Sequence, residues 1–198
     1  SIVKLVDQIE FYTKKMKVKS FLFRDPVFTI NRKRVIEICK LINERGLKIV
    51  WGAELHLKDI DKELAFIMSK AGLRIVFVGI ESINPESIKK SKRQNAPIDQ
   101  QLRAIKILES FGISVKAMFI FGFPGDNFKN ALKTINYAIS LPITYLQFSV
   151  FTPYPGTPIF SDYKDKIKNK NYEEFTQWDL VFDHENLSDK DIKFLLNR

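Results

Sequence analysis

The chain has 198 residues, a mass of 23.1 kDa and a formal net charge of +9 at pH 7. This length suits one large domain, and 45% hydrophobic with 28% charged residues excludes disordered, collagen-like and coiled-coil proteins. The lysines are scattered rather than gathered into a stripe with interleaved aromatics. The charge alone therefore supports only weak, salt-sensitive contact with nucleic acid.

Membrane and metal sites are constrained by the same composition. No apolar stretch approaches the roughly 20 residues that a membrane-spanning helix needs, and the first residues do not resemble a signal peptide. We therefore expect a cytoplasmic protein with no membrane partner. The single cysteine, Cys39, cannot by itself form a disulfide, a structural zinc site or an iron–sulfur cluster. Because Cys39 falls on an apolar helical face, we expect it in the core.

Short apolar runs alternate with segments of helical period along the chain. The first residues predict a helix, and further helices are expected at 31–46, 59–72, 99–112 and 128–140. Strands rich in Val, Ile and Phe are expected between them, at 20–23, 48–52, 74–80, 114–121 and 145–151. Asn31, Asn84 with Pro85, and Ser188 are suited to open helices.

This alternation predicts an α/β fold of parallel strands joined by right-handed crossovers. Two architectures fit it, a doubly wound open sheet and a complete or partial barrel. The tail has a different composition, because 161–178 is polar and Lys-rich with spaced aromatics. We expect a main domain at 1–160 and a C-terminal appendage at 161–198.

In both architectures, ligands bind at the carboxyl ends of the strands. Asp25, His56, Glu81 with Ser82, and Asp126 follow the expected strands, and we expect them to converge on one rim. Carboxylates and a hydroxyl there suit a ligand with an ammonium group and sugar hydroxyls.

Each of these residues also has a structural explanation. Asp25 and Asp126 suit helix starts, and His56 suits a surface or supporting position. Glu81 ends a very apolar strand, where an unpaired carboxylate is costly, so we expect it to be paired or used by a ligand. His184, in the polar tail, is assigned no role.

Taken in order, five segments resemble the radical S-adenosylmethionine (SAM) superfamily, closest to its methylthiotransferase and cobalamin-binding group. They are Asp25-Pro26-Val27-Phe28-Thr29, Ala71-Gly72, Gly79-Ile80-Glu81-Ser82, Gly122-Phe123-Pro124-Gly125 and Pro153-Tyr154-Pro155-Gly156-Thr157-Pro158. The resemblance covers residues 1–160 and implies a partial TIM-type (β/α) barrel with outer helices. It also implies an enzyme that reductively cleaves SAM to a 5′-deoxyadenosyl radical, for hydrogen abstraction or for methyl or methylthio transfer.

The resemblance assigns SAM-binding roles to residues of this sequence. Asp25 corresponds to the position that meets the methionyl amino group, and Glu81 and Ser82 to the position that contacts the ribose or the methionyl part. The positions that correspond to those beside the adenine are Met118, Ile120, Gly122, Phe151 and Thr152. His56 is also assigned to the cofactor site, at a position where relatives often have arginine. Met118 replaces a motif glycine, and Gly125 stands where the motif has glutamate.

The cofactors implied are SAM, a [4Fe-4S] cluster and, as a further candidate, cobalamin. The Cys-x3-Cys-x2-Cys loop of the family is absent from this sequence. We therefore expect the chain to be a fragment whose first strand and cluster loop lie upstream, inactive alone, with no metal ligand of its own. Two alternatives stay open: a cluster-free relative that binds a nucleotide or a partner, and an RNA-contacting module of a tRNA-modifying enzyme.

Overall fold

The computed structural model describes residues 1–91, 95–168 and 171–197. Its strands are β1 (Ser20–Phe23), β2 (Val50–Glu54), β3 (Leu73–Glu81), β4 (Ser114–Phe121) and β5 (Tyr145–Val150). They form one parallel sheet in the order β1-β2-β3-β4-β5, and Ser20 lies opposite Val50 in its register.

This strand order separates the two architectures that the sequence leaves open. A doubly wound sheet reverses its strand order near the middle, whereas here each new strand is added at the same edge. With right-handed crossovers, a consecutive order brings every connecting helix to the same face of the sheet. The fold is therefore of the partial TIM-barrel type, as predicted.

Eight α-helices are described. They are α1 (Ile2–Met16), α2 (Arg32–Glu44), α3 (Lys62–Lys70), α4 (Pro85–Lys90), α5 (Ile98–Ser110), α6 (Phe128–Ser140), α7 (Phe160–Tyr163) and α8 (Asp189–Leu196). The predicted caps Asn31, Asn84 and Ser188 are confirmed, because each side chain accepts a backbone N–H hydrogen bond at the start of its helix. Among the described helices, none is both long and apolar enough to cross a membrane.

Two predicted boundaries are shifted by local hydrogen bonds. The helix expected from Asp59 starts at Lys62, because Asp61 caps it while Asp59 accepts a hydrogen bond from the Thr29 hydroxyl (2.7 Å). The strand expected from Lys48 starts at Val50, because the residues before it bond outside the sheet. The Leu47 N–H donates to the Ile42 carbonyl (3.1 Å), and the Ile49 N–H donates to the Leu47 carbonyl (3.1 Å).

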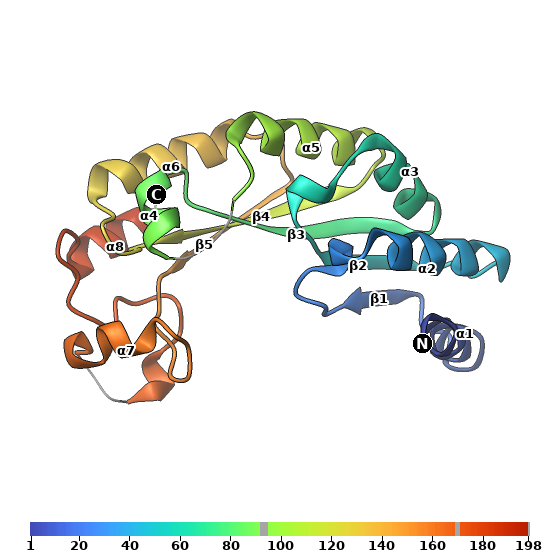
Figure 1. Ribbon diagram of the computed structural model, residues 1–198, viewed down its shortest axis with the longest axis horizontal. Coiled ribbons are helices and arrows are strands. Elements are labelled where there is room, and N and C mark those ends of the chain that lie inside the picture. Colours follow the sequence, from blue (N-terminus) through green and yellow to red (C-terminus); the bar gives the residue numbers. More distant parts are fainter. Residues whose placement is uncertain (92–94, 169–170, 198) are drawn as a thin grey trace. The chain divides into compact units, whose positions relative to one another are not determined.

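The chain divides into two compact units, each described here by itself. The first unit comprises Ser1–Gly79, Ala96–Ala117 and Pro142–Tyr145. In it, α2, α3 and α5 lie on the same side of β1 and β2 (Figure 1). Its core holds an aromatic group, Phe23, Phe28 and Trp51, with ring centroids 4.7–5.4 Å apart. The Trp51 indole N–H donates to the Ala71 carbonyl (2.8 Å), which satisfies the polar atom of this buried side chain.

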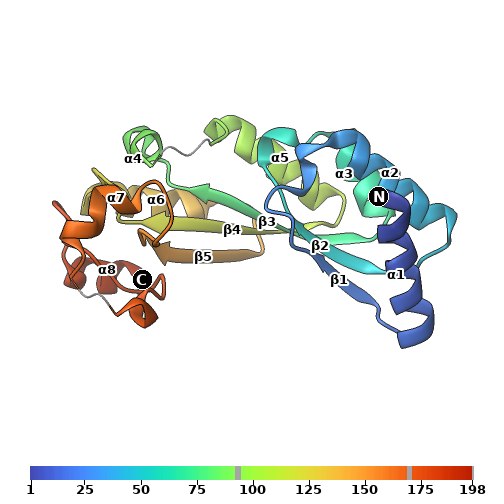
Figure 2. The ribbon, with the colours of Figure 1, turned by 60° about the horizontal axis from the view of Figure 1, so that its bottom comes forward.

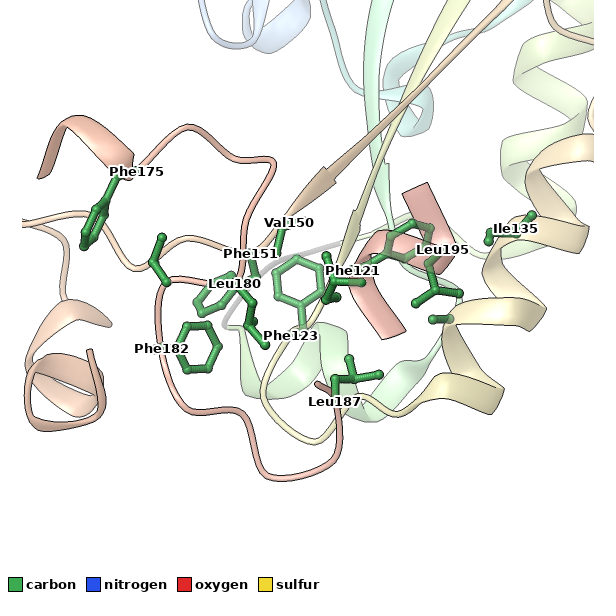
Figure 3. Packing of buried hydrophobic residues seen from close by; sticks show 13 residues of the cluster. Phe121, Phe123, Ile135, Val150, Phe151, Phe175, Leu180, Phe182, Leu187 and Leu195 are labelled. Carbon is green, nitrogen blue, oxygen red and sulfur yellow. The ribbon is translucent and has the colours of Figure 1, made fainter. Parts of the chain in front are cut away.

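The second unit comprises Ile80–Asn95, Met118–Leu141 and Leu146–Arg198. Figure 2 shows α7 and α8 beyond the carboxyl ends of β4 and β5. The core of this unit joins the strand ends to the tail, as Figure 3 shows for Phe121, Phe123 and Phe151 with Leu180 and Phe182. Residues of the predicted appendage thus fill a core together with β4 and β5. The domain boundary at residue 160 stays a prediction.

Two glycines of the first unit predict different costs of substitution. A Cβ on Gly72 (φ +98°) would lie 2.1 Å from the Ile49 carbonyl oxygen, whereas a Cβ on Gly46 (φ +62°) would have no neighbour within 4 Å. We expect Gly72→Ala to lower the free energy of unfolding by more than about 2 kcal/mol, and Gly46→Ala by about 1 kcal/mol. Urea unfolding measures both, and equal losses would contradict the predicted clash.

Candidate functional site

In the first unit, the loop after β1 carries Asp25. Its Oδ1 lies 3.6 Å from Nη2 of Arg34, and the Arg34 guanidinium lies over the Phe28 ring at 5.7 Å. Beside it, Arg24 Nη1 lies 3.2 Å from Oε1 of Glu54, the last residue of β2. Asp25 therefore does not cap α2, a role that Asn31 takes, and it lies at the end of β1 in a polar, charged setting.

His56 follows β2 and is half-buried. It precedes a 3-10 turn at Leu57–Asp59, and its backbone carbonyl accepts the Asp59 N–H (3.1 Å), while its ring makes no capping hydrogen bond. The structure thus places Asp25 and His56 after adjacent strands of the first unit. The other candidate residues belong to the second unit, and the convergence of the two groups on one rim stays a prediction.

In the second unit, β3 ends in a sharp turn at Glu81. Glu81 has φ +66°, and the Ser82 N–H donates to the Ile80 carbonyl (2.9 Å), which is the hydrogen bond of a three-residue γ-turn. Ser82 is buried, and its hydroxyl oxygen accepts the Asn84 N–H (3.1 Å). A positive φ is unusual for a residue with a long side chain, and such strain concentrates at functional sites.

The neighbouring strand β4 ends at Phe121, and the next residue, Gly122, also has a positive φ (+76°). A Cβ there would be in ordinary contact with Leu180, Ile192 and Val150, so the backbone conformation rather than a lack of space favours glycine. The Gly122 N–H donates to Asp126 Oδ2 (3.2 Å). This N–H is therefore already bound within its own loop.

Asp126 closes this loop rather than facing a ligand. It is buried, and its Oδ1 accepts the Asn127 N–H (3.0 Å) in addition to the bond from Gly122. Burial raises the pKa of Asp126, and the hydrogen bonds from Asn127 and Gly122 act in the opposite direction. Asn127, not Asp126, caps α6.

The tail holds the same loop through side chains to which sequence analysis assigned no role. The His184 Nδ1 accepts the Asn186 N–H (3.1 Å), so the ring proton is on Nε2, which donates to the Phe123 carbonyl (3.1 Å). Asn186 Nδ2 donates to the Asp126 carbonyl (3.2 Å), and Glu185 accepts the Gly125 N–H (3.1 Å). Their only sequence signal is a cluster of polar residues just before the Ser188 cap.

The last candidates lie on β4 and just after β5. Met118 and Ile120 are half-buried and alternate along β4 with the fully buried Phe119 and Phe121, so they belong to the opposite, less covered face. After β5, the Phe151 N–H donates to the Phe121 carbonyl (2.8 Å). This bond ties the two strand ends together.

The side chains of Phe151 and Thr152 make contacts within the protein. The Phe151 ring packs against Phe123 and Phe182, with centroids 5.3 and 5.8 Å away. The Thr152 hydroxyl donates to the Val150 carbonyl (3.1 Å). The second unit thus gathers, at the ends of three adjacent strands, the Glu81 carboxylate, the buried Asp126 carboxylate, short turns and an apolar wall.

Comparison with known proteins assigns a family to this arrangement. The model of the Radical SAM superfamily matches residues 1–138. The chain belongs to the radical SAM superfamily, which confirms the resemblance. It is 29% identical over 200 residues to an uncharacterized methyltransferase of Pyrococcus horikoshii, covering 100% of this chain and 43% of that protein. It is 30% identical to an anaerobic magnesium-protoporphyrin IX monomethyl ester cyclase of Rubrivivax gelatinosus, over 87% of this chain and 31% of that protein.

Solved radical SAM structures share the fold. A radical SAM methyltransferase from Kitasatospora setae, solved with cobalamin and a [4Fe-4S] cluster, matches 76% of this chain and 31% of its own, with a TM-score of 0.69 and 19% identity. The coproporphyrinogen III oxidase of Escherichia coli matches 78% of this chain and 38% of its own, with a TM-score of 0.63 and 14% identity. The radical SAM chain described here spans less than half the length of each of these proteins.

The residues present do not fit an iron–sulfur cluster. Across 1–91, 95–168 and 171–197, no three His, Cys, Asp or Glu side chains form a group that could hold a metal ion. The one cysteine of the sequence, Cys39, is fully buried, and burial raises the pKa of its thiol to about 12. The predicted core position of Cys39 is confirmed.

Two aspartates predict opposite pH dependence of stability. The raised pKa of Asp126 means that the folded chain binds this proton more tightly than the unfolded chain, whose value is 3.8. Its contribution to the free energy of unfolding is therefore present below pH 3.8 and falls as the pH rises through the folded value. A hydrogen bond from Arg32 lowers the pKa of Asp61, so the contribution of Asp61 falls as the pH decreases below 3.8.

Urea unfolding between about pH 3 and about pH 6 checks both signs. The difference between wild type and Asp126→Asn is expected to shrink with rising pH, and the difference between wild type and Asp61→Asn to grow. The same sign for both variants would contradict the assignment for Asp126.

Proposed function

We propose that this chain is the SAM-binding part of a radical SAM enzyme that cleaves SAM reductively, for hydrogen abstraction or for methyl or methylthio transfer. The observation that carries the proposal is the end of β3, where the backbone at Glu81 is strained and the neighbouring strand of the sheet is β4. The family match and relatives named as a methyltransferase and a cyclase support it.

The residues of the second unit suit the chemistry of SAM. A carboxylate such as Glu81 accepts hydrogen bonds from ribose hydroxyls or an ammonium group. Met118 and Ile120 offer an apolar wall for the adenine, and the backbone at Phe151 and Thr152 lies at the neighbouring strand end. In this proposal Gly122 permits the turn that ends the wall, and Ser82 supports the Glu81 turn.

Asp25 and His56 belong to the first unit, and their roles in SAM binding stay predictions. We assign the SAM amino group to Asp25 and a supporting contact to His56, on the basis of the family resemblance. The reactive chemistry is supplied by the bound cofactors, and the protein's part is to bind and orient them. No cluster ligand is assigned in this chain. Cobalamin is a candidate for the whole protein because a solved relative of the same fold holds it.

The proposal includes a small-molecule substrate and a cytoplasmic location. A nucleic acid partner stays a prediction from the net charge of +9. It is tested by titrating tRNA at two salt concentrations, since phosphate contacts weaken steeply as salt rises.

The reaction is tested on the protein encoded by the full gene. After anaerobic cluster reconstitution and reduction, we expect SAM to yield methionine and 5′-deoxyadenosine, detected by mass spectrometry. A product formed only with reductant and cluster supports the proposal. A protein that loads no cluster and forms no 5′-deoxyadenosine would instead favour the cluster-free, ligand-binding relative.

Glu81→Gln tests the carboxylate itself. It removes the charge and keeps the side-chain length, so we expect SAM to bind about tenfold more weakly, as for a lost charged hydrogen bond. Glu86→Gln is the matched control, because Glu86 lies in the same unit and its side chain forms an exposed ion pair with Lys90 (2.9 Å). Equilibrium dialysis with labelled SAM measures both, and equal affinities for the two variants would contradict the role of Glu81.

A further inference from the structure

The side chain of Asn95 spans the turn at the end of β3. Its Nδ2 donates to the carbonyl of Ile80 and to that of Ser82 (3.3 Å). Because both partners are carbonyl oxygens, only the amide nitrogen can face them. These carbonyls belong to the residues on either side of Glu81, so one side chain connects both ends of the turn.

The turn is a conformation that needs such support. Glu81 has φ +66°, and a strained backbone persists only where its surroundings hold it. The Ser82 N–H to Ile80 carbonyl bond closes the turn, and the Asn84 N–H holds the Ser82 hydroxyl. Among these contacts, the one from Asn95 is made by a residue that follows α4 in the chain. It therefore links a distant part of the chain to the Glu81 backbone.

We propose that Asn95 is a positioning residue for Glu81, which fixes the direction of the carboxylate at the strand end before SAM arrives. This inference rests on the proposed function, in which Glu81 contacts SAM. Asn95 acts on the ligand only through the turn. Holding a binding group in its bound geometry improves affinity because less ordering is required on binding.

Two substitutions at Asn95 compare the loss of its hydrogen bonds with their replacement by repulsion between oxygen atoms. Asn95→Ala removes both hydrogen bonds, and we expect SAM to bind about tenfold more weakly. Asn95→Asp places carboxylate oxygens against two carbonyl oxygens, so we expect a larger loss, about a hundredfold. Both are measured on the full-length protein with its cluster reconstituted, by equilibrium dialysis with labelled SAM.

A control variant and a second measurement distinguish the positioning role of Asn95 from a general effect on stability. Ser188→Ala removes the capping box of α8 in the same unit and should lower stability without changing SAM affinity. Hydrogen exchange of the Ser82 amide, which closes the turn, should be faster in Asn95→Ala and unchanged in Ser188→Ala. This measurement needs no SAM turnover.

A double-mutant cycle with Glu81→Gln decides whether Asn95 acts through Glu81. If it does, Asn95→Ala weakens SAM binding much less in the Glu81→Gln background than in the wild type. An equal loss in both backgrounds, or unchanged affinity in Asn95→Ala alone, would overturn the inference while Glu81→Gln still weakens binding. A wild-type protein that does not bind SAM would overturn the proposed function, and with it the role of Asn95.

Discussion

The handedness of the strand–helix–strand connection is the constraint on which the remaining structure depends. Five strands in consecutive order, each reached by a right-handed crossover, must have their helices on one face and their carboxyl ends along one edge. The alternation of buried and half-buried residues in β4 follows, because one face meets helices and the other does not. Within each unit, polar residues that follow adjacent strands are then brought to the same edge without any specific interaction between them.

Much of this architecture could be predicted because its signals are local. Continuous apolar runs indicate strands buried on both faces, and Asn31, Asn84 and Ser188 cap their helices through bonds three or fewer residues away. The shift of β2 to Val50–Glu54 was not predictable in this way, because Leu47 and Ile49, just before the strand, are apolar and buried like the residues of the strand itself. There the limit is set by backbone hydrogen bonds, which leave no mark on hydrophobic periodicity.

The candidate site was less accessible to sequence analysis, because its supporting contacts join distant residues. Nothing near Asn95 or His184 in the sequence indicates that one holds the turn after β3 and the other the loop after β4. Asp126 stands near the position where the family motif has glutamate, yet its buried carboxylate binds the amides of its own loop. A carboxylate at a motif position therefore does not by itself indicate a ligand contact, and its hydrogen-bond partners have to be known.

Glu81 differs from Gly122 in what its backbone conformation costs. Gly122 directly follows the adjacent strand with a similar φ and has no Cβ to strain, whereas Glu81 adopts φ +66° at a steric cost of about 1–2 kcal/mol. Glycine at residue 81 would avoid that cost and would form the same turn. Glutamate there lowers stability, and in the proposed function its carboxylate contacts SAM. Among the described non-glycine residues of the second unit, Glu81 and Gln177 have a positive φ, and of these two only Glu81 ends a strand. We therefore explain the strain at Glu81 by the proposed contact with SAM.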